Sequence, residues 1–282
     1  MPEPLPPFDP RPLIAEVDRA LEELLGELPA ESWERPAVKK WRVRHVVAHL
    51  LDGNLRRLSL DRDGWSVPDI PPIASFADLT AWLDGLNAKW TTAAERLSPA
   101  LLLELSRWAN LEVRRFFDGL ELDADAGFPV AWAGEERSAV WMDLARELTE
   151  KWLHQQQIRD AVERPGLTGE RFVAPVLDTF ARALPRSYGR VEAPPGTRVA
   201  IETTDLASCR WLLVREDEAW SLYRAPAPAA AAEADARVRL DADTAWRLFV
   251  KGISGKEART RATAAGPREL TGPFFATVAI MG

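Results

Sequence analysis

The three histidines of this 282-residue chain are the first candidates for chemistry, because imidazole both binds metals and exchanges protons near neutral pH. His45 and His49 lie four residues apart, and His154 follows more than a hundred residues later. We therefore ask which of them can face the interior of the fold beside a carboxylate.

His49 is the better interior candidate of the first pair. From about Val43 to a turn at Asp61–Gly64 the sequence predicts a helix, since apolar residues recur every three or four positions. A helix turns about 100° per residue, which places His49 on the shoulder of this apolar stripe and turns His45 further toward solvent.

Glu150 and His154 lie together in a second predicted helix, from about Ala139 to Glu163. Side chains four residues apart in a helix lie one turn above another, so this carboxylate and this imidazole can coordinate the same ion. With His49 from a facing helix they form a set of two histidines and one carboxylate. Such a set leaves a coordination position open, as catalytic metal sites do.

The spacing of Glu150 and His154 is a weak signal by itself, because any glutamate and histidine in a helix can lie four residues apart. The alternative interpretation is a solvated ion pair or a hydrogen-bonded core histidine. Glu147 is a rival ligand, since it lies two turns before His154 on nearly the same side, whereas Glu150 is one turn away.

The elements that must position these residues form a predominantly helical first part. Apolar periodicity predicts a bundle of antiparallel helices. In addition to the two helices above, the predicted helices are Asp9–Leu28, Phe76–Leu97, Pro99–Leu120 (with Ser98 as its cap) and the shorter Phe172–Leu184.

The pattern changes near Val191, where short β-prone runs replace the helical period. The sequence therefore predicts an α+β protein with a helical bundle at residues 1–190 and a small domain with an antiparallel sheet at residues 191–282. The predicted strands are 199–203, 210–214, 220–223 and 236–240; an alanine- and proline-rich loop is expected at 226–232, a helix at 244–251, and a helix or loop ending near Phe274 and Phe275.

Composition limits the partners. A formal net charge of -7, from 36 basic and 43 acidic residues, argues against nucleic acid or an anionic membrane and favours a small molecule. A single cysteine cannot form an internal disulfide, and the proline-rich start of the sequence has no signal-like apolar run. We expect a cytoplasmic protein without a membrane span, either a monomer or a homodimer.

Two segments carry a resemblance to a known family. Residues 41–51 read WRVRHVVAHLL and resemble the tryptophan-to-histidine motif of the mycothiol-dependent maleylpyruvate isomerase-like proteins, within the DinB-like superfamily. Residues 150–154, EKWLH, look like the second motif of that family, a glutamate followed four residues later by a histidine. The resemblance covers nearly the whole chain.

This resemblance implies a DinB-like four-helix bundle followed by a small α/β domain similar to sterol carrier domains. The implied metal ligands are His49, Glu150 and His154, with zinc as the implied ion, although the ligand types also suit nickel, iron or manganese. Where family members often have an aspartate three residues after the second histidine, this sequence has Gln157. This departure puts the isomerase substrate in doubt but removes no ligand.

The function expected from these features is that of a divalent-metal-dependent enzyme. It would use a low-molecular-weight thiol such as mycothiol for isomerisation or S-transfer on a small organic substrate. The alternatives are a non-catalytic carrier of a small molecule or lipid and a metal-dependent hydrolase.

Other residues are weaker candidates for a role in chemistry or binding. The lone Cys209 is interpreted as a small buried residue and not as a nucleophile. Paired arginines can hold an acidic substrate but are typical of solvated helix or strand faces; these pairs are Arg56 with Arg57, Arg114 with Arg115, and Arg237 with Arg239.

Overall fold

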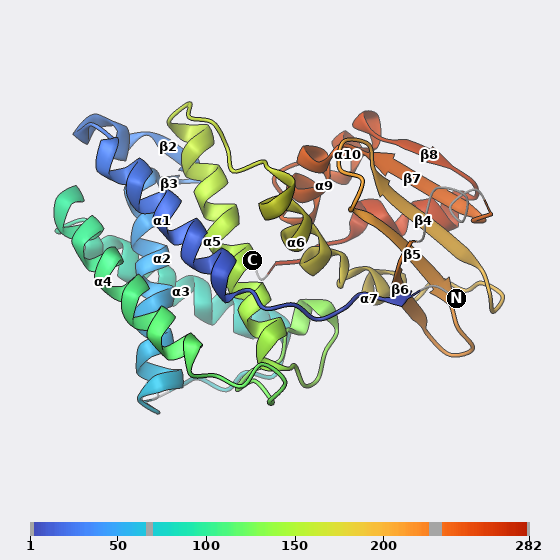
Figure 1. The fold of residues 1–282 in the computed structure, drawn as a ribbon, viewed down its shortest axis with the longest axis horizontal. Helices are drawn as coiled ribbons and strands as arrows, with labels where there is room; N and C mark the ends of the chain where they lie inside the picture. The colour runs from blue at the N-terminus through green and yellow to red at the C-terminus, as the bar shows by residue number, and fades with distance from the viewer. Residues whose placement is uncertain (1–2, 66–69, 226–232, 281–282) are drawn as a thin grey trace. The chain divides into compact units, whose positions relative to one another are not determined.

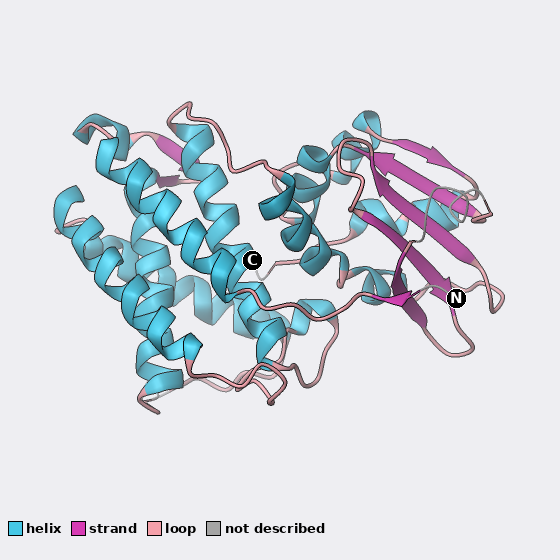
Figure 2. Cartoon of the chain, in the orientation of Figure 1, coloured by secondary structure: helices cyan, strands magenta, loops and turns pink. Residues whose placement is uncertain are grey.

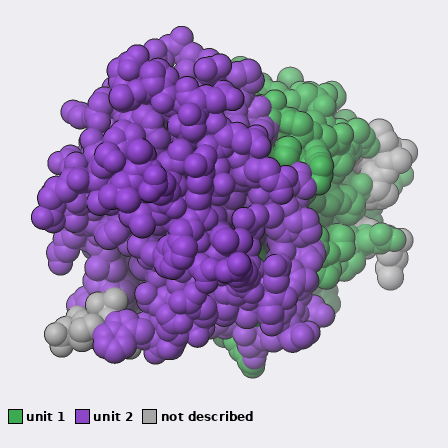
Figure 3. Space-filling model, turned by 60° about the vertical axis from the view of Figure 1, so that its left-hand side comes forward, with its two compact units in different colours: residues 1–8, 128–146, 168–281 green, residues 9–127, 147–167, 282 purple. Residues whose placement is uncertain are grey.

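The computed structural model describes residues 3–65, 70–225 and 233–280, so the loop expected at 226–232 lies outside the described residues. Two compact units make up the chain, and Figure 3 shows them in different colours. One unit contains residues 1–8, 128–146 and 168–281; the other contains residues 9–127, 147–167 and 282. Helix α5 (Val140–Ala161) contributes residues to both units.

The second unit is a helical bundle. Figure 1 shows α1, α2, α4 and α5 side by side, and α3 packs along α2. Their apolar stripes meet in one core cluster, to which Leu25, Val47, Leu102 and Ile158 belong. The predicted helices are confirmed within a few residues; their bounds are Arg11–Glu27 for α1, Val43–Arg57 for α2, Phe76–Ala94 for α3 and Pro99–Asp118 for α4.

The start of α2 fixes the position of the first motif. A short helical turn, η1 (Ala30–Glu34), leads into a hairpin of β2 (Pro36–Val38) and β3 (Trp41–Arg42), and α2 follows directly. At its other end α2 continues as one π-helical segment, η2 (Leu58–Arg62), toward the predicted turn. The cap predicted for α4 is confirmed, because Ser98 Oγ accepts from the backbone N–H of Leu101 at 3.2 Å.

A buried polar network ties four helices of the bundle together. Lys151 of α5 is 3% exposed, and its ammonium group donates to Asp18 of α1 at 2.9 Å and to Asn54 of α2 at 3.1 Å. Asn54 in turn donates to Asn110 of α4 at 2.7 Å. A buried charge needs such partners, because leaving it unpaired in the interior costs several kcal/mol, on the order of 3–5.

The other unit is built on a mixed sheet, which confirms the α+β class. The strand order is β1-β6-β5-β4-β7-β8, and neighbouring strands are antiparallel except for the parallel pair of β4 and β7. The strands are β1 (Glu3–Pro4), β4 (Arg198–Thr203), β5 (Arg210–Arg215), β6 (Trp220–Arg224), β7 (Ala236–Leu240) and β8 (Thr263–Ala265).

Helices cover one face of this sheet (Figure 2). The ring centroids of Phe180 and Phe249 lie 6.0 Å apart, and Trp211 Nε1–H donates to Asp178 at 2.8 Å. Tyr188 donates its hydroxyl proton to the carbonyl of Leu270 at 2.7 Å. The helical elements of this unit include η3 (Ala131–Ala133), α6 (Glu170–Ala181), α7 (Leu184–Tyr188), α9 (Ala242–Phe249), α10 (Gly255–Arg261), α11 (Arg268–Thr271) and η4 (Pro273–Ala276).

The boundary expected near residue 190 stays a prediction, and the packing groups two helices that precede it with the sheet. Helices α6 and α7 precede that boundary, yet their aromatic side chains pack within the unit that contains the sheet. Among the described residues, no helix is both long and apolar enough to cross a membrane.

Candidate metal centre

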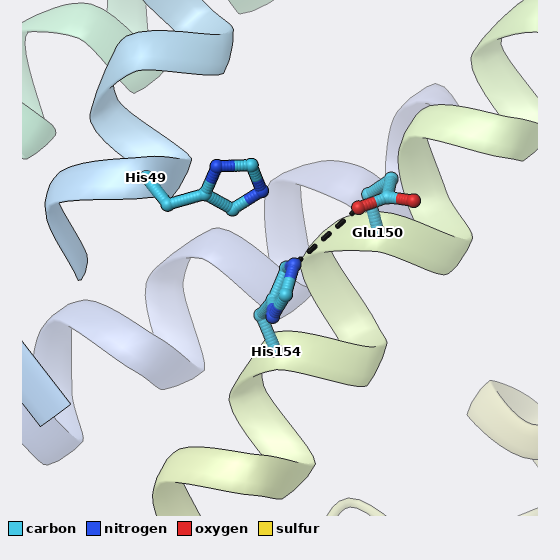
Figure 4. A group of neighbouring side chains, drawn as sticks. All are labelled: His49, Glu150 and His154. Atoms are coloured by element: carbon cyan, nitrogen blue, oxygen red, sulfur yellow. Dashed lines mark ion pairs between the residues drawn. The ribbon is translucent and has the colours of Figure 1, made fainter. Parts of the chain in front are cut away.

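Three side chains from two helices converge in the bundle. His49 comes from α2, and Glu150 and His154 come from α5, one turn apart (Figure 4). One donor atom from each residue lies within 4.8 Å of the donor atoms of the other two. The structure therefore brings together the three residues that the sequence selected.

The phase of the two helices brings these side chains together. Glu150 Oε2 and His154 Nε2 lie 3.4 Å apart, as expected for residues four apart on one helix face. The ring of His49 approaches the ring of His154 edge-on, with 4.9 Å between the centroids. The side chain of His154 is 11% exposed and that of Glu150 is 33% exposed, so solvent reaches the group from the side of the carboxylate.

Burial keeps the His49 imidazole neutral. Desolvation, followed by the neighbouring His154, lowers the pKa of His49 to about 3. Its Nδ1 atom is buried and has no hydrogen-bond partner among the described residues. A neutral imidazole can offer the lone pair of one ring nitrogen to a metal ion while its other nitrogen carries the proton.

The donor set fits one divalent cation. Ligands about 2.1 Å from a tetrahedral ion lie about 3.4 Å from one another, which is the observed separation of Glu150 Oε2 and His154 Nε2. Two neutral nitrogens and one carboxylate compensate part of a double positive charge, and three protein ligands leave a fourth position vacant. With their donor atoms within 4.8 Å of one another, the three residues offer suitable ligand types for one ion with an open position.

The two competing candidates have other partners. Glu147 accepts from the Arg57 guanidinium at 3.3 Å and lies outside the converging group. His45 lies at the start of α2, where its Nδ1 accepts from the backbone N–H of Arg42 at 3.2 Å and its Nε2 lies 3.2 Å from Glu95. His45 therefore caps the start of α2 and lies outside the converging group.

Three further residues lie near the group, of which Trp41 and Arg56 were singled out from the sequence but Asn87 was not. The ring of Trp41 lies 5.0 Å from the ring of His49, and Asn87 in α3 is close enough to His49 to raise its pKa. Arg56, two turns after His49 on α2, is close enough to lower that pKa. Helix phase alone could have indicated Arg56, whereas Asn87 has no signal in the sequence.

The other residues considered in the sequence, Cys209 and the paired arginines, are not part of the converging group. Burial raises the pKa of the Cys209 thiol to about 12, so this fully buried side chain is a protonated thiol at neutral pH and not a nucleophile. The paired arginines are largely engaged by acids of the surface, such as Arg115 with Glu112 and Arg239 with Glu202. A surface hollow of about 570 Å³ between α1 and α4 includes none of the three converging residues.

The fold and the converging histidines and glutamate define an α+β protein with a helical bundle that fits a metal ion. No protein-family model matches the sequence, and no curated protein matches it. Among solved structures, mycothiol-dependent maleylpyruvate isomerase is similar over 90% of this chain and 91% of its own, with a TM-score of 0.52 at 13% identity. A mutant of that enzyme, with a histidine replaced by alanine, matches equally well. The fold implied by the resemblance is thereby confirmed.

Proposed function

We propose that this protein is a divalent-metal-dependent enzyme that uses a low-molecular-weight thiol for isomerisation or S-transfer on a small organic substrate. The observation that carries the proposal is the convergence of His49, Glu150 and His154 on one point with a side open to solvent. The similarity of fold to mycothiol-dependent maleylpyruvate isomerase supports mycothiol as the thiol.

Each ligand has a defined task in this proposal. His49 offers a neutral nitrogen, because burial keeps its pKa far below neutrality. Glu150 supplies the one negative charge, and His154, which lies next to both, offers a second ring nitrogen. The bound ion, zinc by resemblance and otherwise nickel, iron or manganese, would lower the pKa of a coordinated thiol so that the thiolate exists at neutral pH.

The two reaction types differ in the fate of the thiol. In isomerisation the thiolate adds to the substrate and is expelled again, so no thiol is consumed. In S-transfer the thiolate displaces a leaving group and remains on the product, so one thiol is consumed per turnover. A cytoplasmic setting, a small-molecule substrate and a monomeric or homodimeric state complete the proposal.

Elemental analysis of the purified protein tests the ligands. We expect about one equivalent of divalent metal in the wild type and a loss of affinity of at least 100-fold in His49→Ala and His154→Ala, since even outer-sphere partners are worth 10- to 100-fold. His45→Ala is the matched control, because that histidine shares α2 but lies outside the group, and we expect it to retain the metal.

Thermal shift with mycothiol then tests the thiol. A rise in melting temperature that requires the metal supports the proposal. Stoichiometric metal in both histidine variants would contradict the ligand assignment, and metal binding without any thiol-dependent shift would favour the hydrolase.

A further inference from the structure

Each histidine of the metal centre has an uncharged amide near its second nitrogen. In α5, His154 Nδ1 lies 2.8 Å from the amide oxygen of Gln157. An amide oxygen only accepts hydrogen bonds, so the proton belongs to Nδ1 and the lone pair to Nε2. It is Nε2 that lies beside Glu150.

His49 has a corresponding neighbour in Asn87 of α3. His49 Nδ1 and Asn87 Oδ1 are both buried atoms without a hydrogen-bond partner in the described part of the chain. The two residues are nevertheless close enough for Asn87 to act on the pKa of His49, which it raises. An unsatisfied ring nitrogen and an unsatisfied amide oxygen are complementary as donor and acceptor, and pairing them removes the cost of two buried polar atoms.

Figure 4 shows the geometry that results for the two rings. The ring of His49 directs one nitrogen toward Glu150 and the other away from it, and His154 does the same. A proton on the distant nitrogen of each ring leaves both near nitrogens free for one ion.

We propose that Asn87 and Gln157 are positioning residues that fix His49 and His154 in the Nδ1–H tautomer, so that both present Nε2 to the metal. This inference rests on the proposed function for its purpose, but the tautomers exist without metal. The proposal also gives Gln157 a role, which is to orient the ring of His154. An amide orients the ring as a carboxylate would, but it adds no charge. With two neutral imidazoles and one carboxylate as ligands, a divalent ion would keep one net positive charge, which would attract a thiolate.

The tautomers are measured directly in the metal-free protein. Two-bond ¹H–¹⁵N correlation spectra at about pH 8, where an ordinary imidazole is neutral, distinguish a protonated Nδ1 from a protonated Nε2. We expect His49 and His154 to carry the proton on Nδ1. Either ring protonated on Nε2 in the wild-type protein would overturn the assignment for that residue.

Variants then separate positioning from mere packing. Asn87→Leu and Gln157→Leu should shift the affected ring toward a mixture of tautomers and weaken Zn²⁺ affinity by 10- to 100-fold, the usual effect of losing an outer partner. Gln157→Glu keeps an accepting oxygen, so it should keep the tautomer and bind Zn²⁺ at least as tightly as the wild type.

Gln156→Leu is the matched control in the same helix. Gln156 is a buried amide whose oxygen accepts from the backbone N–H of Leu167 and not from a histidine. It should lower the melting temperature without moving either tautomer. Unchanged tautomers and unchanged Zn²⁺ affinity in both leucine variants of the positioning residues would overturn the proposal. If both rings carry the proton on Nδ1 but the protein binds no metal, the tautomer assignment stands and the proposed function is contradicted.

Discussion

At the scale of single residues, the candidate site is governed by the burial of His49. An imidazole that gains a proton in a buried position loses the hydration of its charge, and the nearby His154 adds repulsion. The folded protein therefore strongly prefers the neutral ring. The same preference makes the metal-free fold sensitive to acid.

We expect the metal-free protein to lose stability as the pH falls from about 6.5 to about 3. The unfolded imidazole has a pKa of about 6.5, and the folded one has a pKa of about 3, so within this window the unfolded state binds more protons and is favoured. Above the window both states are neutral and the contribution is constant. The total effect is on the order of a few kcal/mol.

Urea unfolding across this pH range, with a chelator present, measures the effect. The difference in unfolding free energy between the wild type and His49→Asn should shrink or reverse toward low pH, since the variant lacks the titrating ring. Parallel pH profiles for the two proteins would contradict the burial argument.

The sequence predicts the three converging residues better than their surroundings. Helix phase alone selected His49 over His45, because both lie on one predicted helix with a clear apolar stripe. Asn87 could not be found in this way, since its approach to His49 depends on how α3 packs on α2, and packing is not encoded in the period of either helix.

At the scale of the elements, α5 contributes residues to two different groups, the candidate metal centre on one face and the buried polar network on another. Glu150 and His154 face α2 at the candidate metal centre, and Lys151, next to Glu150, enters the buried network with Asp18 and Asn54. The network fixes the relative rotation of α1, α2 and α5, and this rotation determines whether His49 meets the two α5 residues.

We expect Lys151→Met to destabilise the protein by about 3–5 kcal/mol, because it leaves the buried Asp18 carboxylate without its cation. Denaturant unfolding measures the loss. Lys89→Met, at an exposed position of α3, is the control and should stay within about 0.5 kcal/mol of the wild type. Adding Asp18→Leu to Lys151→Met should recover much of the stability; no recovery would show that Asp18 is not the source of the loss.

The long helices were predictable because each has many turns of apolar period. Several short strands were not: β1 has two residues, one of them proline, and β8 reads Thr263–Ala265. Segments of this length have no measurable alternation, and only their pairing with β6 and β7 makes them strands.

At the scale of the whole molecule, neither unit is one continuous stretch of chain. The predicted boundary near residue 190 separates the sheet from α6 and α7, whose Asp178, Phe180 and Tyr188 bind or pack against residues of the sheet unit. That boundary therefore stays a prediction with a direct test.

We expect a fragment of residues 191–282 to be unfolded, because it lacks Asp178, which accepts from Trp211, and Tyr188, whose ring packs against Trp220. A fragment of residues 168–282 retains these partners and should show more tertiary structure. Near-ultraviolet circular dichroism of the tryptophans compares the two, and a native-like spectrum from the shorter fragment would establish the boundary at 190.

Strand β1 has a consequence for biosynthesis. Its two residues pair with Tyr223 and Arg224 of β6, which are translated much later, so they leave the ribosome long before their partner does. When β6 is finally translated, the strand that covers its outer edge is already present. A newly made β-edge is a common starting point for aggregation, and this chain order shortens the time for which that edge is exposed.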